Sequence, residues 1–127
     1  MTKAQIYFIE KLDESKTYEE QFKENPLSIY IHGDGYPNNG GVLTPLWKCV
    51  KMFLEIRGYF DEEYLIARVI QHLANKRDLD AWFPQKQVTG IGIVTEKADR
   101  NYIYIVTAKE IIYWHRQTPE DIKKQSL

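Results

Sequence analysis

The sequence predicts an α+β fold, with two helices packed on one face of an antiparallel sheet of about five strands. Short apolar runs that favour strands occur on both sides of a helical region, at 5–9, 27–32, 88–95, 101–107 and 110–115. Between the second and third of these runs, apolar residues recur twice at helical spacing. The order strand, strand, helix, helix, strand, strand, strand is typical of a helix pair that covers one face of a sheet.

The two helices have recognisable ends. Thr44 suits the N-cap of the first helix, and Gly58 favours the left-handed conformation that ends it. Apolar residues fill most of the circumference of this helix, which predicts that it is largely buried. The second helix follows the cap Asp61 and ends near Lys76 and Arg77, whose charges suit its negative end. The predicted core includes residues of both helices and of one late strand, namely Phe53, Leu54, Val69, Ile70 and Ile103.

The other segments are connections between these elements. Residues 10–25 are strongly charged and predict a solvated connection, with one or two helical turns around 17–23. The linker after the second helix contains Trp82 and Phe83, which either anchor the linker to the core or form a contact patch for a partner. The charged tail from Thr118 onward predicts one short helix that frays.

The length of 127 residues predicts a single domain over residues 1–127, and the composition limits its partners. The formal net charge is −1, with acidic and basic residues interspersed. Binding of long nucleic acid through its phosphates needs a concentrated basic face, so this partner is disfavoured, whereas a single small nucleotide is not. Cys49 is the only cysteine and is interpreted as a small buried hydrophobe. Because no signal peptide or membrane-spanning run is present, we expect a cytoplasmic protein that does not bind membranes.

Strand alternation predicts one sheet face that is rich in tyrosine. An aliphatic face is expected beneath the helices, and the other face is expected to gather Tyr7, Tyr30, His32, Tyr102 and Tyr104, with Trp114 as a further candidate. Two interpretations stay open. The tyrosines are either solvated strand formers, or they are covered by a twin subunit, a protein partner or a stacked ligand. A homodimer is the simplest form of the second interpretation, because symmetric association is common among small proteins.

The segment Gly33–Gly41 contains four glycines, one proline and two asparagines, so it predicts an irregular loop in which Gly35 has a positive φ. Such a loop between a strand and a helix either binds an anion or is a structural turn. His32 and Asp34 could provide a general base, but no Ser or Cys nucleophile lies at motif spacing, and zinc would lack a second ligand pair. His72 is expected to be a satisfied core histidine. We therefore predict no catalytic residue, no metal and no cofactor.

With this loop, the sequence resembles a set of small, mostly uncharacterised bacterial and phage proteins that carry the signature H-x-D-G-Y-P. The signature residues are His32, Asp34, Gly35, Tyr36 and Pro37. Less specific matches follow in one helix and two strands, at Tyr64, Leu65, Ala67, Arg68, Gly90, Gly92, Ile93 and 102–106. The resemblance implies no particular activity. It implies a phage or mobile-element origin, where small proteins often bind host factors or signalling nucleotides.

The sequence therefore predicts a non-enzymatic binding protein, most specifically a phage-type inhibitor of a host defence system. The residues predicted to contact a protein partner or a small nucleotide-like ligand are His32, Asp34, Gly35, Tyr36, Tyr102, Tyr104, Trp82 and Phe83. The alternative is a small hydrolase or nucleotide-processing enzyme that uses His32 and Asp34.

Overall fold

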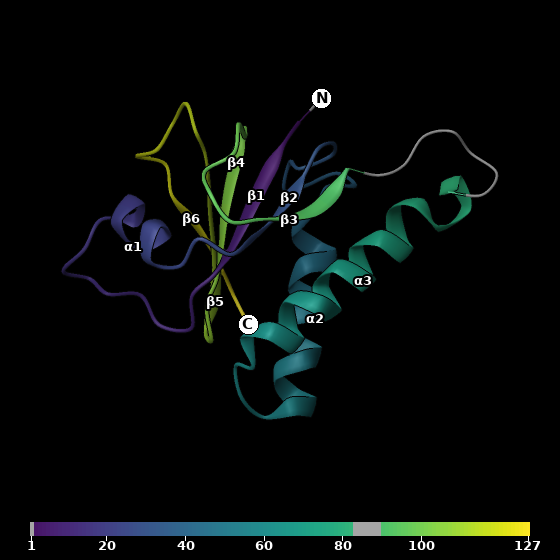
Figure 1. Ribbon diagram of the computed structural model, residues 1–127, viewed down its shortest axis with the longest axis horizontal. Coiled ribbons are helices and arrows are strands. Elements are labelled where there is room, and N and C mark those ends of the chain that lie inside the picture. Colours follow the sequence, from purple (N-terminus) through teal and green to yellow (C-terminus); the bar gives the residue numbers. More distant parts are fainter. Residues whose placement is uncertain (1, 83–89) are drawn as a thin grey trace.

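Residues 2–82 and 90–127 are described by a computed structural model, with residues 75–82 described as backbone only. These residues form the predicted α+β fold, with one sheet of six strands and three helices (Figure 1). The elements in chain order are β1 (Ala4–Phe8), α1 (Tyr18–Glu24), β2 (Ser28–Ile31), α2 (Leu43–Arg57), α3 (Glu62–Trp82), β3 (Ile91–Val94), β4 (Tyr102–Val106), β5 (Glu110–His115) and β6 (Lys123–Ser126). The strand order across the sheet is β3-β2-β1-β4-β5-β6.

The centre of the sheet is parallel, which corrects the prediction of an antiparallel sheet. β1 pairs antiparallel with β2 but parallel with β4, so that Ile6 lies opposite Ile29 on one side and Tyr104 on the other. The chain leaves β3 at the edge of the sheet and returns to its centre to form β4. β1 pairs with β4 only because the chain returns from the edge of the sheet to its centre. No local sequence pattern predicts this connection.

The tail forms a strand where the sequence predicted a short helix. β6 pairs antiparallel with β5, and the indole Nε1 of Trp47 donates to the carbonyl of Ser126 (2.7 Å). All four β6 residues are exposed, and two of them are lysines. Backbone pairing with β5 therefore stabilises the charged tail, and the lysines protect this sheet edge from further pairing.

Helices cover both faces of the sheet, with α2 and α3 on one face and α1 on the other (Figure 1). α1 confirms the helical turns predicted around 17–23. It begins with a capping box, in which Thr17 Oγ1 accepts from the N–H of Glu20 and the Glu20 carboxylate accepts from the N–H of Thr17. α2 ends at Gly58 as predicted, with a φ of 85°. α3 continues to Trp82, so the first part of the predicted linker is helical.

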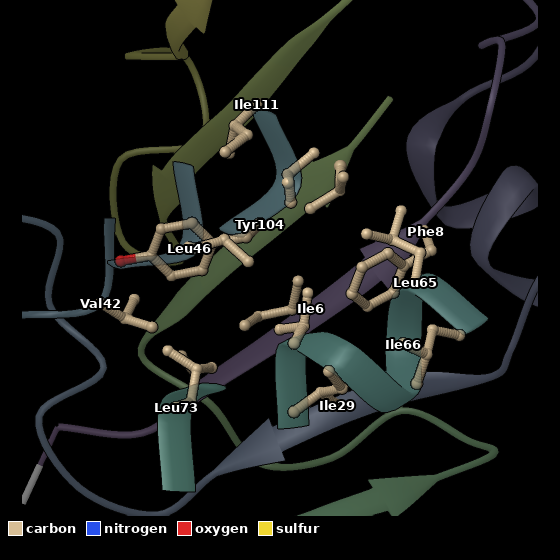
Figure 2. Packing of buried hydrophobic residues seen from close by; sticks show 14 of the residues in the cluster. Ile6, Phe8, Ile29, Val42, Leu46, Leu65, Ile66, Leu73, Tyr104 and Ile111 are labelled. Carbon is tan, nitrogen blue, oxygen red and sulfur yellow. The ribbon is translucent and has the colours of Figure 1, made fainter. Parts of the chain in front are cut away.

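The larger core lies between the sheet and the helix pair. Side chains of the central strands and of α2 and α3 point toward one another there (Figure 2), among them Ile6, Phe8, Ile29, Leu46, Leu65, Leu73 and Tyr104. A smaller core lies on the opposite face, where Phe22 of α1 stacks on Tyr7 with ring centroids 3.8 Å apart. At the centre of the sheet both faces are therefore buried, with Tyr7 beneath α1 and Tyr104 beneath the helix pair.

The side chains of β4 also point the opposite way from the prediction. Residues that lie opposite each other on neighbouring strands share a face, and Tyr104 lies opposite Ile6, which packs beneath the helix pair. Tyr102 and Tyr104 therefore face α2 and α3, while Ile103 faces α1 beside Tyr7. The register places the tyrosines of β1 and β4 on opposite faces.

Part of the predicted core is confirmed. Val69 and Ile103 are buried, whereas Phe53, Leu54 and Ile70 are only partly buried. The sheet covers one side of the helix pair, so apolar residues on the outer side of α2 and at the margin of α3 have no strand above them. As a result, several apolar side chains of α2 and α3 lie at the surface of the helix pair.

Candidate functional site

The Gly33–Gly41 loop is held against the start of β1 and against β4. The N–H of Gly35 donates to the Thr2 carbonyl (2.9 Å), and the Gly35 carbonyl accepts from Tyr104 Oη (2.6 Å). Burial raises the pKa of the Tyr104 phenol, which therefore stays protonated and remains a donor. A Cβ on Gly35 would lie 2.6 Å from the Cβ of Ala4, so this close approach requires a glycine.

The positive φ predicted for Gly35 is found at Asp34 instead, with a φ of 58°. Aspartate tolerates this conformation better than most residues do, so the turn can form without a glycine at that position. His32 and Asp34 are exposed, Gly35 is buried and Tyr36 is half-buried. Pro37 is half-buried as well, so the signature combines two residues that are open to solvent with three that are buried or half-buried.

The loop also provides the start of α2. The N–H of Val42 donates to the Tyr36 carbonyl (2.8 Å), and the N–H of Leu43 donates to the Pro37 carbonyl (3.1 Å). These bonds replace the side-chain cap predicted for Thr44. The N-cap is Val42 and the first helical residue is Leu43, so the helix begins two residues earlier than predicted. Since loop carbonyls occupy these donors, the geometry favours a structural turn over an anion site.

The tyrosines predicted to form one surface are separated and largely buried. Tyr7 is 2% exposed beneath α1, and Tyr104 is 0% exposed beneath the helix pair. The prediction that these tyrosines share one face of the sheet is therefore wrong. Tyr102 is half-buried, and its ring meets that of His115 edge-on with centroids 4.9 Å apart. A binding role for Tyr102 stays a prediction.

The histidines lie on different elements, with His32 after β2, His72 in α3 and His115 at the end of β5. Across residues 2–74 and 90–127, whose side chains the structure describes, no group of three His, Cys, Asp or Glu residues could hold a metal ion. The predicted contact pair Trp82 and Phe83 lies outside the side chains that the structure describes.

An exposed apolar surface lies on the outer side of the helix pair. A groove of about 650 Å³ runs between α2 and α3, and its apolar lining consists of Cys49, Met52, Phe53, Ile56 and Tyr64. Ile56 is 80% exposed, Met52 61% and Tyr64 58%. Among the described residues, four of the six large exposed hydrophobic side chains belong to this end of the helix pair, the fourth being Tyr59. We call this surface the α2–α3 groove.

The rim of the α2–α3 groove is basic. Lys48, Arg57 and Arg68 line it, and no carboxylate is among its described lining residues. The Arg57 guanidinium lies over the Tyr64 ring, 5.0 Å from its centroid, and donates to the Asp61 carboxylate (2.8 Å). Lys48 and Arg68 are exposed. The groove therefore has an apolar lining, and the charged residues described on its rim are all basic.

Two polar groups lie within the groove. Burial raises the pKa of the Cys49 thiol, an effect that the charge of Arg68 opposes, so the thiol stays protonated as a small hydrophobe does. His72 Nε2 is buried and has no hydrogen-bond partner among the side chains described. This corrects the expectation of a satisfied core histidine.

Sequence reasoning missed the groove because it equated apolar residues on α2 with burial. The signal was present: apolar positions cover a wider arc of α2 than one sheet and one neighbouring helix can bury. Met52 and Ile56 lie in the remaining part of that arc. Tyr59 and Tyr64 extend the exposed apolar surface at the connection to α3.

No family model matches the chain, and no curated protein or solved structure matches it. In the described part of the chain, every helix is too short or too polar to cross a membrane. The resemblance to small bacterial and phage proteins stays a prediction.

Replacing His32 with alanine should change the free energy of unfolding by no more than about 0.5 kcal/mol. The side chain is exposed, and the backbone N–H that donates to the Gly90 carbonyl (2.7 Å) is retained. Urea unfolding followed by circular dichroism measures this change. A loss above about 1 kcal/mol would show that the imidazole stabilises the loop.

Proposed function

We propose that this protein is a non-enzymatic binding protein that docks a protein partner in the α2–α3 groove. The observation that carries the proposal is the gathering of exposed Met52, Ile56, Tyr59 and Tyr64 at one end of the helix pair. Contiguous exposed apolar side chains with a polar rim are typical of interaction surfaces.

The residue types in the groove support this proposal. Tyrosine, methionine and arginine are enriched at protein interfaces, whereas acidic residues are depleted. The lining contains Met52, Tyr64, Arg57 and Arg68, and the acidic residues at the start of α3 line other surfaces, Glu62 beside α1 and Glu63 beside β3. A groove of this composition can supply a central anchor pocket for a partner side chain.

The enzymatic alternative has less support. His32 and Asp34 are exposed, whereas catalytic acids and bases usually owe their reactivity to burial and to charged neighbours. The more specific prediction, an inhibitor of a host defence system, rests on the resemblance alone. The groove adds a surface through which such an inhibitor would act.

The proposal is tested with the double variant Met52→Glu and Ile56→Glu. Both side chains are exposed, so the fold should survive, and two carboxylates on the apolar surface should weaken partner binding at least about 30-fold. Capture from host lysate identifies the partner, and calorimetry with the purified partner measures the dissociation constant.

The matched control is Ile93→Glu, which changes a side chain that is 57% exposed on β3, outside the groove. The control should bind the partner as the wild type does. Equal binding by the groove variant and the wild type would overturn the proposal, as would loss of binding in the control alone.

A further inference from the structure

We infer that the occupant of the α2–α3 groove is an acidic amphipathic helix of a protein partner, an inference that rests on the proposed function. The shape of the groove is the first argument. Its lining follows two rows of α2 at helical spacing, 48–52–56 and 49–53–57, and one row of α3, 64–68–72. Rows of side chains on two packed helices leave a groove that can accept the ridge of a third helix.

The length of the lining agrees with a short helix. The α2 rows extend from Lys48 to Arg57, nine residues apart, which corresponds to about 13 Å along the helix axis. A partner helix of two to three turns covers that distance. Two or three apolar side chains at positions i, i+3 or i+4 and i+7 would then lie on Met52, Ile56 and Tyr64.

The charges on the rim of the α2–α3 groove determine which kind of amphipathic helix can bind there. Arg57 already donates to Asp61, so the cations that remain for a partner are Lys48 and Arg68, one on each side of the groove. Both are exposed. A helix with Glu or Asp beside its apolar stripe places a carboxylate near each cation, while a basic helix meets like charges there.

The same rim argues against a second copy of this chain. A two-fold symmetric dimer would place the groove of one copy on the groove of the other. Lys48 and Arg68 would then face cations of the second copy, with no carboxylate among the described lining residues to pair with them. Charge complementarity thus favours a different, acidic partner over self-association through this surface.

The inference is tested with labelled peptides of about 18 residues, long enough to form a helix in contact with a surface. One peptide carries a Leu stripe flanked by Glu, the second the same stripe flanked by Lys, and the third Glu flanks with Ser in place of the stripe. Fluorescence anisotropy measures binding to the full chain. The first peptide should bind at least about tenfold more tightly than either of the others.

The charge-reversal variant Lys48→Glu with Arg68→Glu should reverse the order of the first two peptides. Its matched control is Lys23→Glu with Lys109→Glu, which makes the same change in net charge at exposed positions outside the groove. The control should keep the wild-type order. Thermal unfolding of both variants confirms that each is folded during the binding measurement.

The outcomes separate this inference from the proposed function. Equal binding of the Glu-flanked and Lys-flanked peptides, lost in the Met52→Glu and Ile56→Glu variant, would overturn the charge inference and leave the groove as a binding surface. If the purified partner binds but none of the peptides does, the inference that the partner binds as a helix would be overturned. Light scattering tests the last alternative. If the wild type is a dimer and the Met52→Glu and Ile56→Glu variant is a monomer, the occupant of the groove is a second copy of this chain and the inference of an acidic partner is overturned.

Discussion

Replacing Gly41 with alanine is expected to destabilise the fold by at least about 3 kcal/mol. A Cβ at this position would overlap the carbonyl oxygen of Tyr36, far inside van der Waals contact. That oxygen accepts the N–H of Val42, so it cannot move without disturbing the start of α2. Urea unfolding followed by circular dichroism measures the loss.

The matched control is Gly40→Ala, in the neighbouring position. Gly40 has a φ of 88°, but nothing lies within 4 Å of a Cβ there. The control carries only the cost of left-handed backbone, about 1–2 kcal/mol. A Gly41 variant that is more stable than the Gly40 variant would show that the close approach to Tyr36 is not needed.

Truncating Tyr104 should have a similarly large effect. Its side chain is completely buried and its hydroxyl holds the Gly35 carbonyl. Removing the ring in Tyr104→Ala should cost about 3–5 kcal/mol, and removing only the hydroxyl in Tyr104→Phe about 1–3 kcal/mol. Tyr102→Phe, at a half-buried position of the same strand, is the control and should stay within about 0.5 kcal/mol of wild type.

Tyr104→Phe should also change the dependence of stability on alkaline pH. Burial raises the pKa of Tyr104 in the folded protein above its ordinary value of 10.0. The neutral phenol therefore stabilises the fold fully below about pH 10, and this contribution falls by up to about 1.4 kcal/mol per pH unit above it. Burial raises the pKa of Tyr7 as well, so the variant should lose only part of the alkaline decline. A decline identical to that of wild type would contradict the raised pKa of Tyr104.

The strands could be predicted from sequence because the signal is local. Apolar runs such as 27–32 and 101–107 indicate a strand wherever its partner lies. The sequence could not predict which side chains of β4 point toward the helix pair. Their orientation depends on pairing between Ile6 and Tyr104, which are remote in sequence. Alternation identifies two faces of each strand but does not tell which faces of two strands belong together.

The candidate site was predicted less well than the fold. The signature residues Gly35 and Tyr36 were recognised as special, and the structure gives them packing contacts within the loop. The groove on the outer side of the helix pair was missed, because Met52 and Ile56 look like core residues in a helical pattern. Their exposure depends on the position of the sheet relative to α2, a tertiary property.

The parallel pair of β1 and β4 has a consequence for the synthesis of the protein. The chain closes this pair between residues 98 positions apart, as in the bond between Lys3 and Asn101. A ribosome releases β1 and β2 long before β4, so the nascent chain has an unpaired apolar strand edge until residues 102–106 have emerged. Contacts of such long sequence separation slow folding, because the entropy of closing the loop is lost first. Chains that stop before residue 102 should therefore aggregate, and molecular chaperones should bind the nascent protein through β1.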